Sequence, residues 1–459
     1  MSLPPSTGTP YDTITIGLLS IPMEIVEKIL ICLHPRDVIA FSGSCRFGAE
    51  LVHRSTDQYF WRQLFLVLFD DPRHAIHPSR PDLPSFNWKG ELVRRMRAER
   101  AAFGIGTNDP ASVLETLVSV TEDALPISNP HTDPPPPSRN LEWLENVLRN
   151  SHILDASFLP DGAKFGDRLK AYMALSLKED TEDDLEELRA IRTRSRCFVY
   201  DLRNYQAHNN WGPYLSNGKV NWTHVEAIVN VVETNLREQP SEDIIPRPPF
   251  GLQAIRARSA PGDYTGPDWA GVEGTWQRYV CFMDYRDLFA FNVSIVPMRS
   301  LDPISQEYIY QFSNAHDGPR APAFFDDRDF REATRLIELT LHLIPRHKLR
   351  IRFPSGEPPP HTNPDYPPLY FAGSSRGASG QEATVQGFVF MGQDYVPRWR
   401  FTSIHDDEPQ WSSEGAQVGH VASAMGVVGA WSAFHHGEGD PAGPFWLWKV
   451  SHEPGPSTI

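Results

Sequence analysis

The spacing of apolar residues changes near the middle of the chain, and this change constrains the fold more than any other feature. Up to about residue 240, apolar residues recur three and four positions apart, as in NLEWLENVL at 140–148, which indicates amphipathic helices. From about residue 250 they alternate with polar residues, which indicates strands. SEDIIPRPPFG at 241–251 separates the two regions. The pattern predicts an α+β protein of several domains, helical first and β-rich last.

The β-rich region predicts a closed antiparallel barrel. In RLIELTLHLI, the apolar residues from Ile337 to Leu343 occupy every second position, and 397–404 and 445–450 show the same alternation. Further strands are predicted from apolar, aromatic and β-branched runs at 279–283, 287–293, 384–391 and 426–434. Because Gly, Pro and Asp turns separate many short strands, closure into a barrel is the arrangement that leaves no exposed edge.

Proline-rich and polar stretches mark the remaining boundaries. The chain has 459 residues and 42 prolines, several of which cluster in ISNPHTDPPPPSR at 127–139. A chain of this length buries a large core without help from metals or disulfides. We expect a disordered lead at 1–17, a three-helix domain at 18–66, a helical linker or scaffold at 67–240 that contains the 127–139 loop, and a barrel domain at 250–459.

Charge and cysteine content disfavour several classes of protein. A net charge of −15 disfavours nucleic acid and anionic membrane as partners, because both attract basic surfaces. The four cysteines form no CxxC pair, so buried thiols in a reducing compartment are favoured over a zinc site or disulfides. The N-terminus lacks the positive region of a secretory signal, and no apolar run reaches the ~18 residues of a membrane span. We therefore expect a cytoplasmic or nuclear protein.

The helical stretch near the N-terminus carries more apolar surface than it can bury. Ile25, Ile29 and Leu33 lie four residues apart, as do Val26 and Leu30, and together they form a broad apolar stripe. Two further predicted helices add large aromatic and aliphatic side chains. Because roughly 45 residues cannot enclose so many large side chains, some of them must pack on the rest of the chain or on another protein.

The order of residues in this stretch resembles an F-box, over about 19–66. The positions that carry the resemblance are Ile21, Pro22, Glu24, Ile25, Ile29, Leu30, Leu33, Pro35, Asp37, Val38, Cys45, Arg46 and the Trp61-Arg62-Gln63-Leu64 run. The F-box pattern usually opens with Leu-Pro where this chain has Ile-Pro, and it often has Leu where this chain has Val26. Both changes keep an aliphatic side chain. An ordinary core-forming helical hairpin is the alternative.

The F-box resemblance implies a role in ubiquitination. F-box proteins bind the Skp-type adaptor of SCF ubiquitin ligases, and the adaptor joins them to a cullin and a RING protein. An amphipathic helical surface that docks into an apolar groove is a known form of such recognition. The resemblance places the adaptor contact on Pro22, Glu24, Ile25, Ile29, Leu30, Leu33, Pro35 and Val38.

The C-terminal region also carries a resemblance. DWAGVEGTWQRYVCFMDYRDLFAFN at 268–292 and the segment from Trp411 to Lys449 resemble the C-terminal region of fungal F-box proteins, and YPPLYFAGSSRG at 366–377 resembles its middle part. The resemblance implies a lipocalin-like β-barrel over about 250–459. It places the first and last strands of the barrel in the two outer segments, and it implies that this domain holds the target.

Five tryptophans and two arginines are candidates for contacts in the barrel. The tryptophans form either a pocket wall or part of the inward-facing core, and they are Trp269, Trp276, Trp399, Trp411 and Trp431. Arg278 and Arg400 either clamp a carboxylate or phosphate of a target or form structural ion pairs. SSEG at 412–415 is predicted as a turn whose hydroxyls cap it, with a substrate contact as the alternative.

Two clusters of charged and titratable residues have simpler interpretations. His435 and His436 are adjacent, and adjacent residues of a strand point to opposite faces, so we expect a polar loop and no metal there. KEDTEDDLEELR at 178–189 is predicted as the solvated start of a helix, with a docking site for a basic partner as the alternative.

No catalytic motif is found in the sequence. A Walker loop, GxGxxG after a strand and HExxH are missing, and GSSRG at 373–377, which fits the letters GxSxG, is not interpreted as a nucleophile elbow. We therefore expect a non-catalytic subunit of a ubiquitin ligase that needs no cofactor and binds a protein substrate. A ligand-binding barrel protein in a non-ligase Skp-adaptor complex is the alternative function, and an enzyme with its site in the barrel is a third.

Overall fold

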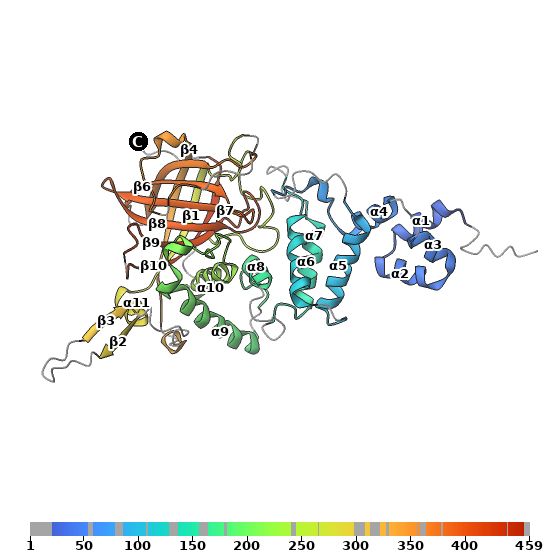
Figure 1. Cartoon of the computed structure of the whole chain (residues 1–459), viewed down its shortest axis with the longest axis horizontal. Coiled ribbons are helices and arrows are strands. Elements are labelled where there is room, and N and C mark those ends of the chain that lie inside the picture. The colour runs from blue at the N-terminus through green and yellow to red at the C-terminus, as the bar shows by residue number, and fades with distance from the viewer. Residues whose placement is uncertain are drawn as a thin grey trace, which may run out of the picture. The chain divides into compact units, whose positions relative to one another are not determined.

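A computed structural model of the chain divides into two compact units (Figure 1). The N-terminal unit comprises Met1–Phe69 and Pro84–Met96, and the barrel unit comprises Asp70–Leu83 and Arg97–Ile459. The structure describes residues 21–53, 58–78, 86–106, 109–127, 136–155, 164–178, 181–239, 245–264, 266–297, 308–312, 322–326, 330–354, 356–358, 364–377, 380–437 and 439–453. The predicted lead at 1–17 and the centre of the predicted proline-rich loop lie outside these residues.

The N-terminal unit is helical. Its helices are α1 (Met23–Ile31), α2 (Pro35–Ser44), α3 (Arg46–His53), α4 (Tyr59–Leu68) and the first part of α5 (Trp88–Ala102). Pro35 begins α2, where its missing N–H is not needed, and the side chain of His34 accepts a hydrogen bond from Arg36. The sequence predicts three helices up to residue 66, whereas an extended residue, Cys45, separates α2 from the additional helix α3.

A small core holds these helices together. Val26 and Leu30 of α1 are buried, as is Val38 of α2. Beside α4, the guanidinium carbon of the fully buried Arg95 lies 4.9 Å from the ring centre of Phe65. Arg95 also donates a hydrogen bond to Glu91 at 2.9 Å, one turn earlier on α5. The unit thus buries the Arg95 guanidinium against an aromatic ring and beside a carboxylate, and these two contacts offset the cost of burying its charge.

The helices that precede the barrel strands in this unit are α6 (Pro110–Glu122), α7 (Arg139–Asn150), α8 (Lys164–Met173), α9 (Glu182–Val199) and α10 (Trp222–Glu238). Four of them begin at polar residues that satisfy free backbone N–H groups. The side chains of Asp109, Ser138, Thr181 and Asn221 accept hydrogen bonds from the first turns of α6, α7, α9 and α10. The acidic run at 178–189 therefore leads into a helix, α9, as its sequence predicts.

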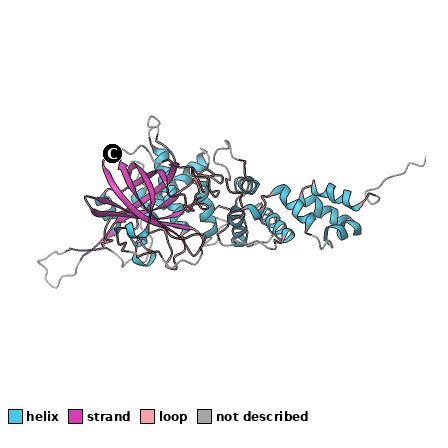
Figure 2. Cartoon of the chain, turned by 90° about the horizontal axis from the view of Figure 1, so that it is seen from above, coloured by secondary structure: helices cyan, strands magenta, loops and turns pink. Residues whose placement is uncertain are grey.

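Eight antiparallel strands close into a barrel, which confirms the predicted α+β class (Figure 2). They are β1 (Gly274–Phe282), β4 (Ala333–Ile344), β5 (Leu369–Gly377), β6 (Glu382–Met391), β7 (Pro397–His405), β8 (Glu408–Gln417), β9 (Val427–Ala433) and β10 (Ala442–Ser451). From β4 to β10 each strand pairs with the next along the chain, and β1 pairs with both β4 and β10. The first and last strands of the barrel thus lie in the two segments that the sequence indicated.

Two predictions of secondary structure are wrong, and Cys32, one of the thiols predicted to be buried, is exposed. The run at 287–293 was predicted as a strand, but Tyr285–Asn292 is a helix, α11, and the short strand β2 (Val293–Pro297) follows it and pairs with β3 (Tyr308–Phe312). The buried residues Leu288, Phe291 and Asn292 of α11 share one helical face. A run this short cannot show whether its apolar residues have the spacing of a helix or of a strand. SSEG at 412–415 is not a turn, because it lies inside strand β8.

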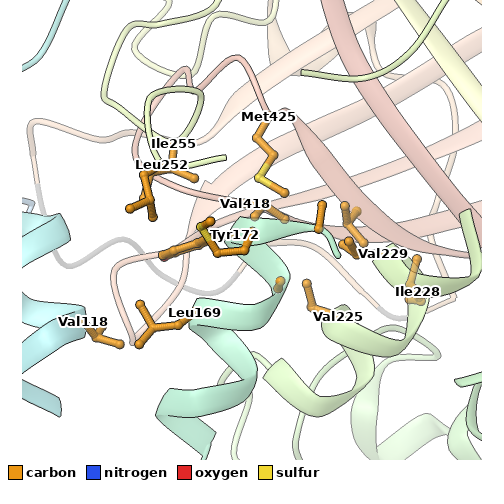
Figure 3. Packing of buried hydrophobic residues seen from close by; sticks show 14 of the residues in the cluster. Val118, Leu169, Tyr172, Val225, Ile228, Val229, Leu252, Ile255, Val418 and Met425 are labelled. Carbon is orange, nitrogen blue, oxygen red and sulfur yellow. The ribbon is translucent and has the colours of Figure 1, made fainter. Parts of the chain in front are cut away.

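Helices cover one side of the barrel wall. α10 packs against β9, β10 and β1, and a buried cluster joins its Val225, Ile228 and Val229 to Leu169 and Tyr172 of α8 (Figure 3). On β10, Trp446 and Trp448 belong to this outer cluster, whereas Phe445 and Leu447 belong to the cluster inside the barrel. Because both faces of β10 are buried, its sequence is apolar at nearly every position.

Candidate functional sites

Helix α1 presents apolar side chains on two faces. Val26 and Leu30 point into the core of the N-terminal unit, while Ile25 and Ile29 remain 44% and 42% exposed. Leu33, just after the helix, is 38% exposed. We call the exposed set, Ile25, Ile29 and Leu33, the α1 face. A soluble protein rarely leaves neighbouring large aliphatic side chains uncovered, so such a patch indicates an interaction surface.

The structure divides the predicted adaptor contacts into two groups. Pro22, Glu24 and the α1 face are exposed, and they are accessible to a partner. Leu30, Pro35 and Val38 are buried within the N-terminal unit. The exposed group defines a candidate docking surface, and the buried group holds the helices that present it.

The barrel encloses a cavity of about 740 Å³ at one end. Strands β1, β5 and β7 reach this end with their last residues, and β4, β6 and β8 with their first, as their antiparallel pairing requires. Below the cavity, the interior is filled by apolar side chains that include Trp276, Phe371 and Trp399. Eight-stranded barrels have room for either packed side chains or one small ligand. This barrel has packed side chains in one part of its interior and a cavity at one end.

Arg278 lies in the wall of the cavity and is only 5% exposed. It is the charged member of an inward-facing row on β1 that also contains Trp276, Val280 and Phe282. Its Nη2 donates a hydrogen bond to Ser413 Oγ at 2.8 Å, and its guanidinium carbon lies 4.4 Å from the ring centre of Phe445. The alternation of side chains along β1 thus points the guanidinium of Arg278 into the interior of the barrel.

The charge of Arg278 is poorly compensated. Burial lowers the pKa of Arg278 to about 9, and no carboxylate among the described residues raises the pKa back. Its buried Nε donates no hydrogen bond to any described residue. The guanidinium is still cationic at neutral pH, so this position combines a buried positive charge with an unused donor. Such a group is a candidate binding residue for an anion.

Arg400 has a different environment although it also lies in the barrel wall. It points outward from β7, donates a hydrogen bond from Nε to Glu414 at 2.7 Å and another from Nη1 to the Gly356 carbonyl at 3.1 Å. Arg400 and Glu414 are both buried. The structure thus places Arg400 in an ion pair outside the cavity, and only Arg278 of the two predicted clamps faces the cavity.

The candidate tryptophans lie in three different environments. Trp411 and Trp431 line the cavity, with ring centres 5.3 Å apart. Trp276 and Trp399 form part of the buried core next to it, with ring centres 5.1 Å apart. Trp269 precedes β1 and donates a hydrogen bond from Nε1 to the Pro367 carbonyl, away from the cavity lining. The first pair is therefore available to a ligand, and the second pair supports the site from below.

Sequence reasoning missed the polar residues that share the cavity with Arg278. Ser403, His405 and Gln410 line the cavity and were not considered, and Ser413, the hydrogen-bond partner of Arg278, was assigned to a turn. The signal that could have found them is the alternation itself. Ser403 follows Trp399 and Phe401 on every second position of β7, so all three face the interior.

The adjacent histidines have structural contacts. The ring of His436 stacks on Trp211 with centres 3.9 Å apart, and its Nδ1 lies 3.1 Å from Ser432 Oγ. Burial lowers the pKa of His436 to about 4. Within the described residues, no group of three His, Cys, Asp or Glu side chains is arranged to hold a metal ion.

Comparison with known proteins identifies no relative. No family model matches the sequence, and neither the curated proteins nor the solved structures contain a match. Among the helices that the structure describes, none is long and apolar enough to cross a membrane.

Proposed function

We propose that this protein is the substrate-recognition subunit of an SCF-type ubiquitin ligase, in the cytoplasm or nucleus. In this proposal the N-terminal unit is an F-box that binds a Skp-type adaptor, and the barrel unit holds a target protein. The observation that carries the proposal is the α1 face, because Ile25 and Ile29 stay exposed on a helix whose opposite face is already buried, and Leu33 stays exposed just after that helix. The order of residues that resembles an F-box supports the same assignment.

The energetics of the α1 face suit a docking surface. More than half of each side chain is already covered, so completing its burial contributes about 1 kcal/mol per residue. Three such side chains, with hydrogen bonds around them, supply a useful share of a stable interface, less the cost of ordering the partners. Pro22 and Glu24 are exposed at the start of α1 and extend the surface.

The proposed contribution to ubiquitination is positional, and the chain itself is proposed to be non-catalytic. The adaptor connects the N-terminal unit to a cullin and a RING protein, and the barrel unit holds a target near the charged conjugating enzyme. Holding two reactants together raises their effective concentration, which accelerates transfer without any catalytic group on this chain.

Substitution within the α1 face tests the docking assignment. Ile25→Asp and Ile29→Asp each place a carboxylate in the proposed apolar contact, where it loses hydration without gaining a partner. We expect each variant to lose at least about tenfold in affinity for a purified Skp-type adaptor, measured by calorimetry. Val67→Asp is the matched control, because Val67 is an exposed aliphatic residue of α4 outside the proposed contact.

The three variants change exposed residues, so circular dichroism should show unchanged helix content. Adaptor binding by Ile25→Asp at the wild-type affinity would contradict the docking assignment. Equal losses in Ile25→Asp and Val67→Asp would also contradict it, because the contact would then not be specific to the α1 face.

A second candidate function is a ligand-binding barrel protein in a non-ligase complex with the Skp-type adaptor. The cavity with its buried Arg278 favours this candidate, because a cavity of this size suits a small molecule better than a protein surface. Affinity purification separates the two functions. Recovery of cullin together with adaptor supports the ligase subunit, whereas recovery of adaptor without cullin supports the second candidate.

A further inference from the structure

We propose that the barrel cavity binds a small amphipathic carboxylate, whose acid group pairs with Arg278 and whose apolar body lies beside Trp411 and Trp431. This inference goes beyond the docking of the N-terminal unit and stands on the barrel unit alone. The observations that carry it are the volume of the cavity, the burial of Arg278 and the unused hydrogen-bond donor of that side chain.

The donors of Arg278 match a carboxylate. Nη2 uses one hydrogen on Ser413, which leaves its second hydrogen, and the neighbouring Nε has no partner among the described residues. Adjacent nitrogens of a guanidinium present parallel donors whose spacing fits the two oxygens of a carboxylate. The Phe401 and Phe445 rings lie 5.1 and 4.4 Å from the guanidinium carbon. They fix the plane of the guanidinium before the ligand arrives.

The charge of the cavity favours a monoanion over a phosphate dianion. Arg278 is the buried cation of the lining, and Arg335 is exposed near the start of β4. The lining also includes Asp406, which repels anions. A single negative charge at Arg278 compensates the buried cation, whereas a second charge would enter a space with no further buried cation to meet it.

The walls of the cavity favour a small molecule over an inserted peptide. The backbone groups of the strands in the wall are used in strand pairing, so the polar partners that these strands offer are side chains such as Ser375, Ser403 and Gln410. Each residue of an extended peptide would bring one N–H and one C=O that must find partners when buried. An aliphatic or aromatic body makes no such demand and is suited to the faces of Trp411 and Trp431.

The depth of Arg278 sets the length of the ligand. Phe282 ends β1, and Arg278 lies four residues earlier. A rise of about 3.3 Å per residue and a strand tilt of about 40° place Arg278 roughly 10 Å below the rim. A medium-chain alkanoic acid or an arylalkanoic acid spans this depth when it enters acid first.

The test uses the full chain and matched probes that differ only in their head group. Decanoate, decanol and decyl phosphate are titrated by calorimetry below their micellar concentrations, and tryptophan fluorescence follows the environment of Trp411 and Trp431. An aromatic acid, 4-phenylbutyrate, and its alcohol form a second pair. We expect at least one acid to bind at least about tenfold more tightly than its alcohol and than the phosphate, because charge-assisted hydrogen bonds are the strongest of their kind.

Two arginine variants assign the binding to the cavity. Arg278→Met keeps the length of the side chain and removes its charge, and we expect it to reduce the affinity for the acid to that for the alcohol. Arg376→Met is the matched control, because Arg376 is also on the barrel but its side chain is 59% exposed and pairs with Glu382. The control is expected to bind the acid with wild-type affinity.

Three outcomes would overturn the inference. One is that no acid of the panel binds, and another is that acid and alcohol bind equally. The third is that a peptide with a free C-terminal carboxylate binds Arg278-dependently while its amidated form and the small acids do not, which would make the site a peptide reader. Adaptor binding is measured separately. A chain that binds the adaptor but no acid would therefore contradict this inference and leave the docking proposal unaffected.

Discussion

Two arginines in the wall of one barrel illustrate opposite ways of burying a charge. Arg400 has a carboxylate partner, Glu414, and a carbonyl partner, Gly356. Arg278 has one hydroxyl and two aromatic rings. Removing one member of a buried ion pair destabilises the folded protein, because the other charge is left without a partner. Removing a buried charge that has no opposite charge beside it stabilises the folded protein, because the cost of burying that charge is lost. The two residues therefore predict opposite effects of the same substitution.

We expect Arg278→Met to raise the free energy of unfolding of the ligand-free protein by about 1–4 kcal/mol, because it replaces a buried cation by an apolar side chain. Arg400→Met is expected to lower that free energy by about 3–5 kcal/mol, because buried Glu414 loses its guanidinium partner. Urea denaturation of the two variants measures both values. A loss of stability in Arg278→Met as large as that in Arg400→Met would show that Arg278 is a structural residue.

A buried histidine makes stability depend on pH. Burial lowers the pKa of His224 to about 3 in the folded protein, whereas the unfolded chain has a value near 6.5. Between these values the unfolded state binds the extra proton, so stability falls as the pH drops from about 6.5 towards 3. We expect His224→Gln to reduce this dependence by about 1.4 kcal/mol per pH unit. Denaturation midpoints at pH 4.5 and 6 measure the difference, and an unchanged slope would contradict the prediction.

At the scale of strands, glycines inside the barrel allow neighbouring strands to curve. Gly373, Gly387, Gly415, Gly429 and Gly443 all occupy interior positions, and a Cβ at each would meet another strand at 2.8 Å or less. Glycines at such positions relieve the crowding of a tightly coiled sheet.

Gly373→Ala tests the role of these glycines. An added Cβ would lie 1.9 Å from the Thr340 carbonyl oxygen across the β4–β5 pair, so the strands must separate. We expect a loss of about 1–3 kcal/mol in the free energy of unfolding, the usual range for overpacking. Gly266→Ala is the control, because a Cβ there meets nothing within 4 Å. Equal stability of the two variants in urea denaturation would contradict this account.

Period-two alternation predicted β4, β7 and β10, and short apolar or aromatic runs predicted β1, β6 and β9. Sequence reasoning failed in two informative places. The run at 287–293 is short and apolar, and packing of Leu288 and Phe291 decides in favour of a helix. SSEG looked like a turn because its residues are small and polar. Pairing on both sides of β8 and cover from other elements bury it instead, and that tertiary context is not visible in a single sequence.

At the scale of the whole molecule, the sequence predicted the α+β class and the closure of the barrel. It also identified Arg278 as a candidate binding residue, but it did not predict that no described carboxylate would pair with this side chain. Ion pairing depends on which strands are neighbours, so Arg278 and Arg400 could not be told apart from composition. The same limit applies to α1, whose apolar stripe was visible as one surface. Only the packing of α2 to α4 shows that Leu30 is covered and Ile29 is not.

The seam between β1 and β10 has a consequence for biosynthesis. About 160 residues separate the end of β1 from the start of β10, and a ribosome adds them in roughly 10–30 s. Throughout that interval one side of β1 lacks its final neighbour, and an unsatisfied strand edge is a template for aggregation. The nascent chain is therefore prone to aggregate until its last strand emerges, and a premature stop codon upstream of β10 removes the closing strand and leaves that edge permanently open.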